Sequence, residues 1–385
     1  MLILKILFRN AFRNKLRTSL TILGIMIAIL AFGLLRTLIS AWYAGIEASS
    51  ATRLVTRNAV SIIFPLPQFY KDKIQQVRGV KTVSYGTWFG GIYGEEKNFF
   101  ANYAVEAGSF LELYPEFIIP LNEKEAFLKD QKGCVVGKKL ADKFGWKVGD
   151  LVTLKGTIFL GNWDFVVRAI YQGRDRDTDE SQFFFHWNYL NEIQKKVLPS
   201  WADQVGYYMI GVARPELAGE VAVAIDQLFK NSLAETLTET EKAFQQGFVA
   251  MSGAIVMAIQ IVSFVVIFII MAVVANTMAM TTRERVGEYA ILKTLGFGGG
   301  HITVLIFGES LVITIIGCLL GIAVTFPGRE IISIELGTYF PVFNIERETL
   351  LLDFIASLAI AFFSAIIPTQ RAVKIRIAEG LRRIG

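Results

Sequence analysis

Cysteine and histidine are scarce in this sequence, with two of each among 385 residues. Cys318 falls inside a long apolar run, so Cys134 and Cys318 are not expected to form a disulfide framework. His186 and His301 have no second ligand at the spacing of a zinc site. We therefore expect no metal site in this chain.

Motifs for nucleotides and for common catalytic sites are missing as well. The sequence has no Gly-x-x-x-x-Gly-Lys-Ser/Thr P-loop, no Gly-x-Gly-x-x-Gly after a predicted strand, and no Gly-x-Ser-x-Gly nucleophile elbow. Acidic pairs such as Glu95 and Glu96 are interpreted as surface charge. A membrane hydrolase that uses scattered Ser, Asp and Glu stays open as an alternative, but no pattern favours it. We expect no catalytic residue, no bound cofactor and no enzymatic activity.

Charge is missing from one stretch of forty residues, 243–282. As one helix it would be about 60 Å long, twice the roughly 30 Å thickness of the hydrocarbon core of a membrane. Its first half carries Gln245, Gln246 and Ser252, whereas residues 255–274 are apolar enough for lipid. The stretch predicts one continuous rod, a stalk joined to a membrane span. Three other apolar runs, at 20–39, 303–326 and 354–367, are also predicted spans.

Basic residues gather beside the predicted spans. Residues 1–17, 283–301 and 371–385 together hold thirteen Lys and Arg against three acids, whereas residues 42–242 are close to neutral. The positive-inside rule therefore places both termini and the 283–301 loop in the cytoplasm. We expect a multi-pass protein of the bacterial plasma (inner) membrane, with residues 42–242 in the periplasm or outside the cell. This distribution does not favour nucleic acid as a partner.

The predicted fold class is a membrane protein with four transmembrane α-helices and a large α+β extracytoplasmic domain between the first and second spans. In that domain, strands at 133–137, 151–155 and 163–171 and helices at 138–144 and 216–233 lack a regular βαβ order. Two subdomains are expected within it. The predicted division is an amphipathic interfacial helix at 1–17, a first span at 18–41, the α+β domain at 42–242, stalk and second span at 243–282, a cytoplasmic coupling loop at 283–301, a third span at 302–326, a short outer loop at 327–349, a fourth span at 350–370 and a cytoplasmic tail at 371–385.

Basic residues at four-residue spacing mark the N-terminal helix, namely Lys5, Arg9, Arg13 and Arg17. Such a stripe is expected to face anionic head groups at the membrane surface, so membrane lipid is a predicted partner. The alternative is the start of a cleaved signal peptide.

Polar and small residues within the spans are the other candidates for function. Arg36 lies near the outer end of the first span, where it is expected to snorkel to the interface. Glu309 is expected to face protein, water or a cation, because an isolated carboxylate in lipid is costly. Gly317 and Gly321 form a small-xxx-small pattern that permits close packing of helices.

The most specific segment follows the rod and reads T-R-E-R-V-G-E-Y-A-I-L-K-T-L-G-F at residues 282–297. It resembles the cytoplasmic loop of MacB/FtsX-type ABC transporter permeases, in which a run like E-R-x-R-E-I-G-x-L-K/R-A-L-G precedes a span containing a glutamate. The matching residues here are Glu284, Arg285, Glu288, Leu292, Lys293, Leu295, Gly296 and, within the span, Glu309. Gly287 stands where the family often has Arg, which leaves the partner of Glu288 open. Residues 10–25, 134–150 and 368–382 are also similar to family segments, in the same order.

This resemblance implies a four-span permease subunit of the LolC/LolE kind, without a fused ATPase. It implies a homodimer, or a dimer with a paralogous permease, bound to a cytoplasmic ABC ATPase dimer that holds ATP and Mg. It also implies mechanotransmission, in which the stalks pass ATP-driven motion to the outer domains. The expected ATPase-coupling loop comprises Arg283, Glu284, Arg285, Glu288, Lys293 and Gly296. Charge reversal at Glu288, or Arg285→Glu, is then expected to uncouple ATP hydrolysis from transport.

The expected function is export or extraction of a lipid, a lipoprotein, or an amphiphilic or toxic compound. In a two-membrane cell the cargo would pass to a periplasmic adaptor and an outer-membrane channel. The alternative is an FtsX-like signalling subunit that regulates a cell-wall partner. Aromatic residues at 183–185, with Trp187 and Trp201, are interpreted as core rather than as the lining of a cargo cleft.

Overall fold

The computed structural model describes residues 2–47, 49–175, 177–336, 340 and 342–377, without the side chains of residues 2–6 and 333–336. Contacts within the chain divide it into two compact units. The helical unit comprises Met1–Ser40, Gly253–Ile334 and Phe343–Gly385, and the α+β unit comprises Ala41–Ser252 and Glu335–Val342. Residues 378–385 of the predicted tail, and residues 337–339 and 341 of the predicted outer loop, lie outside the described residues.

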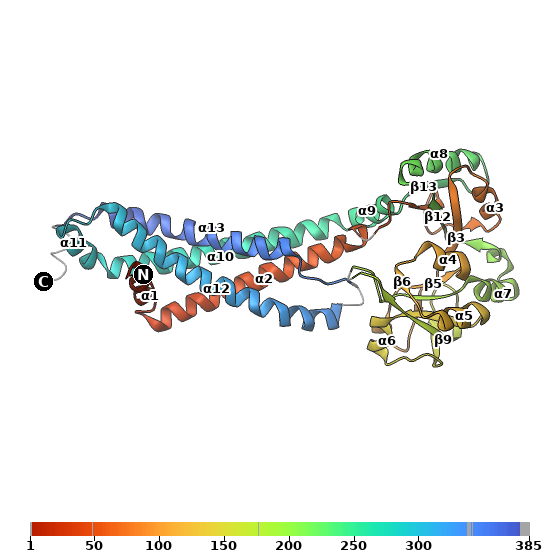
Figure 1. Cartoon of the computed structure of the whole chain (residues 1–385), viewed down its shortest axis with the longest axis horizontal. Helices are drawn as coiled ribbons and strands as arrows, with labels where there is room; N and C mark the ends of the chain where they lie inside the picture. The colour runs from red at the N-terminus through yellow and green to blue at the C-terminus, as the bar shows by residue number, and fades with distance from the viewer. Residues whose placement is uncertain (1, 48, 176, 337–339, 341, 378–385) are drawn as a thin grey trace. The chain divides into compact units, whose positions relative to one another are not determined.

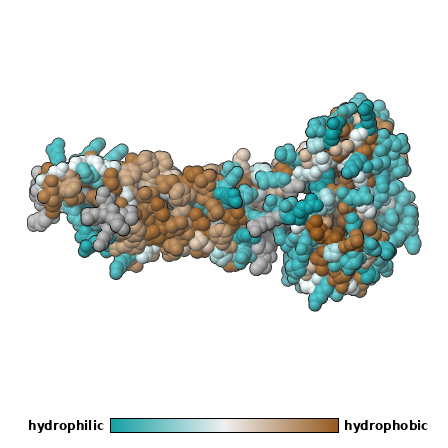
Figure 2. All heavy atoms as spheres, in the orientation of Figure 1, coloured by the Kyte–Doolittle hydropathy of each residue, from teal (hydrophilic) through white to brown (hydrophobic). Residues whose placement is uncertain are grey.

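The helical unit is a bundle of long apolar helices with two short helices at one end (Figure 1). Its elements are α1 (Leu2–Ala11), α2 (Lys15–Glu47, whose last turns belong to the α+β unit), α10 (Gly253–Glu284), α11 (Val286–Thr294), α12 (Gly299–Leu336) and α13 (Arg347–Lys374). Among the described residues, α2, α10, α12 and α13 are long and apolar enough to cross a membrane. Their outer faces expose large apolar side chains such as Ile261, Phe264 and Phe268, and Figure 2 shows this unit largely in the colour of hydrophobic residues. Such a surface suits lipid rather than water.

The predicted continuous rod is interrupted. One residue, Ser252, separates helix α9 (Glu241–Met251) from the start of α10. Serine competes for backbone hydrogen bonds and glycine has high backbone entropy, so Ser252-Gly253 is a natural place for a helix to break. The stalk and the second span are therefore separate helices, and the boundary between the two units lies at this break.

Two other boundaries also differ from the expected ones. Helix α12 runs through Pro327 to Leu336, although the sequence pattern ends the third span before this proline. Proline removes only one donor from a helix, and neighbouring helices make it tolerable inside a membrane bundle. The loop at 283–301 contains the nine-residue helix α11, which the sequence analysis does not predict.

The α+β unit is built on one mixed sheet with the strand order β13-β1-β12-β3-β5-β10-β7-β9-β8-β4, and β6 pairs with β9. The larger strands are β1 (Arg53–Asn58), β3 (Val80–Trp88), β5 (Asn102–Val105), β7 (Gly133–Gly137), β8 (Leu151–Gly156), β9 (Gly161–Gly173), β10 (Phe183–His186), β12 (Tyr207–Val212) and β13 (Thr236–Thr240). The two-residue strands are β2 (Leu66–Pro67), β4 (Gly91–Ile92), β6 (Phe117–Ile118) and β11 (Gln204–Val205). Hydrogen bonds join all but β2 and β11 into one sheet, and the division into two subdomains stays a prediction.

Helices lie against this sheet at several points (Figure 1). They are α3 (Tyr70–Gln75), α4 (Ala107–Leu113), α5 (Leu121–Lys129), α6 (Lys138–Phe144), α7 (Trp187–Val197), α8 (Ala218–Leu228) and α9. The strand predictions at 133–137, 151–155 and 163–171 and the helix prediction at 138–144 are confirmed. The predicted helix at 216–233 is shorter, as α8. Among the described strands, only the β5–β10 and β7–β9 pairs are parallel, which fits an α+β fold without βαβ order.

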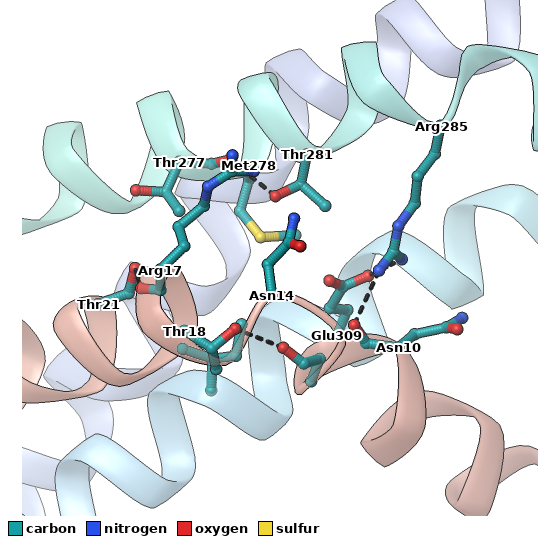
Figure 3. A pocket seen from close by; sticks show the side chains of 12 residues that line it. Asn10, Asn14, Arg17, Thr18, Thr21, Thr277, Met278, Thr281, Arg285 and Glu309 are labelled. Carbon is teal, nitrogen blue, oxygen red and sulfur yellow. Dashed lines mark hydrogen bonds and ion pairs between the residues drawn. The ribbon is translucent and has the colours of Figure 1, made fainter.

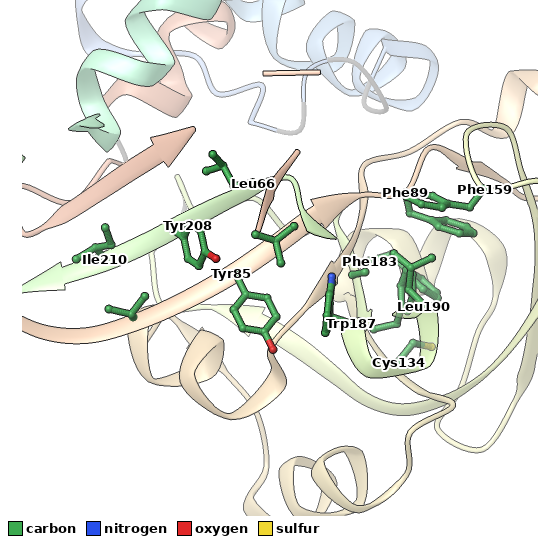
Figure 4. Close-up of a cluster of buried hydrophobic side chains, with 14 of the residues drawn as sticks. Leu66, Tyr85, Phe89, Cys134, Phe159, Phe183, Trp187, Leu190, Tyr208 and Ile210 are labelled. Carbon is green, nitrogen blue, oxygen red and sulfur yellow. The ribbon is translucent and has the colours of Figure 1, made fainter. Parts of the chain in front are cut away.

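Aromatic side chains fill the core on both faces of the sheet. Phe183 and Phe185 belong to the larger buried cluster, which Figure 4 shows with Phe89, Trp187 and Tyr208. The residue between them, Phe184, belongs to a second cluster with Phe110 and Tyr171. Successive residues of a strand point to opposite faces, so the Phe183–Phe185 run serves two cores. The interpretation of residues 183–185 and Trp187 as core is confirmed, whereas Trp201 is 47% exposed.

The buried His186 gives the α+β unit an expected pH dependence. Its Nε2 lies 2.8 Å from the Phe127 carbonyl oxygen, and burial lowers the pKa of the imidazole below its ordinary value. The unfolded chain then binds a proton at a higher pH than the folded chain does, so stability falls as the pH drops below about 6.5. We expect the wild type to lose more thermal stability between about pH 7 and about pH 5 than His186→Gln does.

Tryptophan fluorescence suits this measurement, because all six tryptophans lie between Trp42 and Trp201, inside the α+β unit. His301→Gln is the control, since His301 is exposed and belongs to the helical unit. Equal pH slopes for wild type and His186→Gln would contradict the assignment.

Candidate functional site

The segment between α10 and α12 is fastened to the end of the bundle. Tyr289 and Ala290 of α11 are buried against the helical unit, and burial raises the pKa of Tyr289 to about 12, so its phenol stays neutral. On the other side of this segment, Ile291, Leu295 and Phe297 are exposed by 45%, 70% and 43%. We call these three residues the apolar patch. Gly296 has a φ of +89°, which ends α11 in a conformation that favours glycine.

Arg285 reaches from the start of this segment into the bundle. One terminal nitrogen, Nη1, donates to Oε2 of Glu309 on α12 at 2.8 Å, and Nη2 donates to the Asn10 carbonyl oxygen at 2.8 Å. Figure 3 shows the guanidinium pointing toward both groups. The two charged side chains are only 9% and 6% exposed. Glu309 therefore faces a cation, as the sequence analysis expects, and its partner lies within the same chain.

Two further ion pairs join the same segment to the N-terminal region. Arg17 donates to both carboxylate oxygens of Glu284, at 2.8 and 2.9 Å, and Arg13 pairs with Glu288. The second pair raises the pKa of Arg13. We call Arg13, Arg17, Glu284, Arg285, Glu288 and Glu309 the ion-pair cluster. It connects α2 and the residues just before it to the end of α10, to α11 and to α12.

The ion-pair cluster revises the expectation for the basic stripe. Arg13 and Arg17 face carboxylates of the same chain rather than lipid head groups, whereas Arg9 is exposed. The side chain of Lys5 lies outside the described residues. Gly287 has no side chain that could pair with Glu288, and Arg13 is the partner of Glu288 instead. These contacts span about 270 residues of sequence, so no local pattern indicates them.

Lys293 is engaged as well. Its Nζ donates to the carbonyl oxygens of Val373 and Ile375 at 2.7 Å each. Carbonyl groups at a helix C-terminus lack partners within the helix and favour a nearby cation. Lys293 therefore caps α13, and the segment 284–293 contacts every long helix of the bundle.

Of the predicted coupling-loop residues, Arg283 is exposed, Gly296 forms the turn, and the other four make contacts inside the chain. Arg285→Glu would place a second carboxylate beside buried Glu309. That variant would test folding of the bundle rather than docking of an ATPase, so the sequence-based experiment is unsuitable at this position.

A small pocket lies beside the ion-pair cluster, between the start of α2 and the end of α10 (Figure 3). Asn14, Thr21, Thr277 and Thr281 are among its lining residues. Its volume of about 10 Å³ holds about one water molecule. The pocket is therefore too small to be a cargo site.

Glycines place α12 directly on α2. A Cβ atom at Gly317 would lie 2.7 Å from the Cβ of Ile25, and one at Gly321 would lie 2.8 Å from the Cβ of Ile29. The two glycines thus form a close helix contact, as their spacing predicts.

Arg36 lies near the other end of α2. Its Nε is buried without a hydrogen-bond partner among the described residues, so the expected snorkelling leaves this atom unsatisfied.

A second charged cluster, which the sequence analysis misses, lies in the α+β unit. Arg53 begins β1 and Glu241 begins α9, and Nε of Arg53 donates to Oε2 of Glu241 at 2.8 Å. Arg53 also donates to the Leu113 carbonyl oxygen at 2.9 Å, pairs with Glu116 at 2.7 Å, and lies over the Tyr114 ring. We call this group the junction network. Because β1 follows α2 and α9 leads to α10, it joins the points where the chain enters and leaves the sheet.

Comparisons with known proteins agree with this architecture. The chain matches the MacB-like periplasmic core domain over residues 18–228 and the FtsX-like permease C-terminal domain over residues 260–377. An uncharacterized ABC transporter permease of Methanocaldococcus jannaschii is 26% identical over 400 residues, which cover 97% of this chain and 96% of that protein.

Two solved domains are also similar in fold. The periplasmic region of MacB from Actinobacillus actinomycetemcomitans matches with 9% identity and a TM-score of 0.38, covering 53% of this chain and 95% of that one. The extracellular domain of the noncanonic ABC-type transporter YknZ from Gram-positive bacteria matches with 11% identity and a TM-score of 0.37, covering 49% and 100%.

The family models together cover most of the chain, and the first alone covers more than half of it. They assign residues before and after the α+β unit to one permease architecture, a multi-pass membrane protein with an extracytoplasmic domain between the first and second spans. The chain belongs to the MacB/FtsX family of ABC transporter permeases.

Proposed function

We propose that this chain is the permease subunit of an ABC transporter that works by mechanotransmission. ATP hydrolysis is assigned to a cytoplasmic ATPase dimer rather than to these 385 residues, which include no P-loop. The observation that carries the proposal is the attachment of the α11 segment to the bundle. Through Arg17–Glu284, Arg285–Glu309 and Lys293, a force on α11 acts on α2, α12 and α13 together.

The ATPase is proposed to dock on the apolar patch. Ile291, Leu295 and Phe297 expose their apolar side chains at the end of the bundle, outside the predicted spans. Contact with lipid does not account for them there, and a group of exposed apolar side chains marks an interaction surface. Arg283, in the last turn of α10, is exposed and carries a positive charge. The positive-inside rule supports a cytoplasmic location for this end and for both termini.

Motion is proposed to reach the α+β unit through two routes, α2 into β1 and α10 through α9 into the sheet. The junction network ties these routes to each other at Arg53 and Glu241. A dimer of this chain, or a dimer with a paralogous permease, would move two α+β units. The cargo class is a lipid, a lipoprotein or an amphiphilic compound taken up outside the cytoplasm. A periplasmic adaptor and an outer-membrane channel would be needed only in a two-membrane cell.

The docking proposal is tested with the full chain purified from its native membranes. We expect an ATPase with a P-loop to copurify, with ATP hydrolysis that depends on the permease. The double variant Ile291→Glu/Leu295→Glu should lose the ATPase, because charge is costly at a buried apolar contact. Leu233→Glu is the matched control, since Leu233 is fully exposed on the α+β unit. Retention of the ATPase by the double variant would refute docking at the apolar patch.

A further inference from the structure

Asp353 of α13 is a buried carboxylate that neither the ion-pair cluster nor the junction network uses. Its relative exposure is 0%, and both carboxylate oxygens are buried without a hydrogen-bond partner among the described residues. Glu309, the other carboxylate deep in the bundle, is paired with Arg285. These two buried acids are therefore in opposite situations.

Among the residues that the structure describes, no cation lies within ion-pair distance of Asp353 and no donor reaches its carboxylate. On α2, Gly33 faces it so closely that a Cβ there would lie 3.0 Å from Oδ2 of Asp353. On α12, the methyl group of Thr325 would lie 3.5 Å from the same Cβ atom at Gly33, and the Thr325 hydroxyl donates to the Gly321 carbonyl oxygen. The Sγ of Cys318 lies 3.7 Å from the backbone oxygen of Asp353. Helix α10, which packs along α13, carries no charged residue before Arg283.

Arginines lie one helical turn away from this point on two of the three neighbouring helices. Arg36 follows Gly33 by three residues, or about 4.5 Å along α2, and Arg329 follows Thr325 by four residues, or about 6 Å along α12. The Nε atoms of both arginines are buried and lack a partner among the described residues. Helix α13 thus carries a buried carboxylate without a partner, and α2 and α12 each carry a half-buried arginine whose Nε lacks one. The carboxylate is out of register with both cations by one turn.

We propose that Asp353 is a proton-binding site of the bundle. In the arrangement described it is a neutral carboxylic acid, because an unpaired carboxylate in an apolar interior is far more costly than a carboxyl group. Loss of the proton favours a displacement of α13 along α2 and α12 by about one turn, which brings the carboxylate to Arg36 and Arg329. Gly33 lies about 27 Å along α2 from Lys15, so the proton is exchanged near the end of the bundle away from the ion-pair cluster. This inference goes beyond the proposed function and does not depend on it.

Stability as a function of pH tests the site in the full chain reconstituted in phosphatidylcholine vesicles. Asp353→Asn keeps the shape of the neutral acid but does not ionise. We expect the melting temperature of the wild type to fall relative to that of Asp353→Asn as the pH is raised from about 4 to about 7. Over this range the unfolded aspartate has lost its proton while the folded carboxyl group still holds it, and the two variants differ least at the lower pH. Parallel curves over this range would overturn the proposal.

A second measurement needs no variant at Asp353. Dicyclohexylcarbodiimide reacts with protonated carboxyl groups in apolar surroundings, and mass spectrometry locates the adduct. We expect Asp353 to be labelled in the wild type and Glu309 to be labelled only in Arg285→Ala, which shows that the reagent reaches the bundle. Labelling of Asp353 should drop roughly tenfold for each pH unit above its titration point. An unlabelled Asp353 alongside a labelled Glu309 in Arg285→Ala, or protection of Asp353 by Na⁺ at constant pH, would overturn the assignment of a proton.

Discussion

Arg285→Ala is expected to destabilise the helical unit by about 3–5 kcal/mol, the usual cost of removing one partner from a buried ion pair. The reason is that Glu309 would stay 5% exposed without its cation, and the Asn10 carbonyl oxygen would lose a donor as well. Cys318 reports on this unit, because its thiol is buried in the bundle. The rate at which a thiol reagent modifies Cys318 should rise by roughly 100-fold or more.

Arg283→Ala is the matched control for this prediction, since Arg283 is the exposed arginine two residues earlier. The double variant Arg285→Met/Glu309→Gln should recover most of the lost protection, because it leaves no unpaired charge. Cys134 in the α+β unit should keep its slow rate throughout. Equal rates for Cys318 in Arg285→Ala and Arg283→Ala would show that the buried pair contributes nothing to the bundle.

Glu241→Ala is expected to have the largest effect in the α+β unit, a loss of about 3 kcal/mol. Arg53 would keep Glu116 and the Leu113 carbonyl oxygen but lose the partner of its Nε. The backbone N–H of Ser50 and the hydroxyl of Tyr114 would each lose an acceptor too. Tryptophan fluorescence should show a lower melting temperature. In a separate measurement of amide hydrogen exchange, the β1–β13 edge should exchange earlier than in the wild type.

Glu239→Ala serves as the comparison, because Glu239 lies on the adjoining strand β13 and its pair with Arg57 is more exposed. Such a pair contributes at most about 1 kcal/mol. If Glu241→Ala and Glu239→Ala lower the melting temperature equally, the junction network is not the anchor that its burial indicates.

Local patterns were enough to predict the spans and much of the sheet. The apolar runs correspond to α2, α10, α12 and α13, and alternation together with turn residues predicted β7, α6, β8 and β9. Gly317 and Gly321 could also be assigned to a helix contact, because their spacing is itself the signal. The break at Ser252 was less visible, since a single residue of low helix propensity is often tolerated inside a helix.

The charged clusters could not be predicted from the sequence for a different reason. Arg13 and Glu288 are separated by 275 positions, and Arg53 and Glu241 by 188, so their pairing depends on the complete fold. Asp353 lies just before the apolar run at 354–367, where an acid is ordinarily interfacial. Its burial depends on the close approach of Gly33 on α2, which the sequence around Asp353 does not indicate.

Transmission from the ion-pair cluster to the stalk is the central claim, and a distance measurement tests it most directly. Spin labels at Gln246→Cys, an exposed position on α9, would report the separation of the two stalks in the permease dimer bound to its ATPase. Both native cysteines are buried and should stay unlabelled. We predict that ATP changes the distance in the wild type, and that Glu284→Gln/Glu288→Gln abolishes the change while ATP hydrolysis continues. An unaltered ATP-dependent change in that variant would contradict the account.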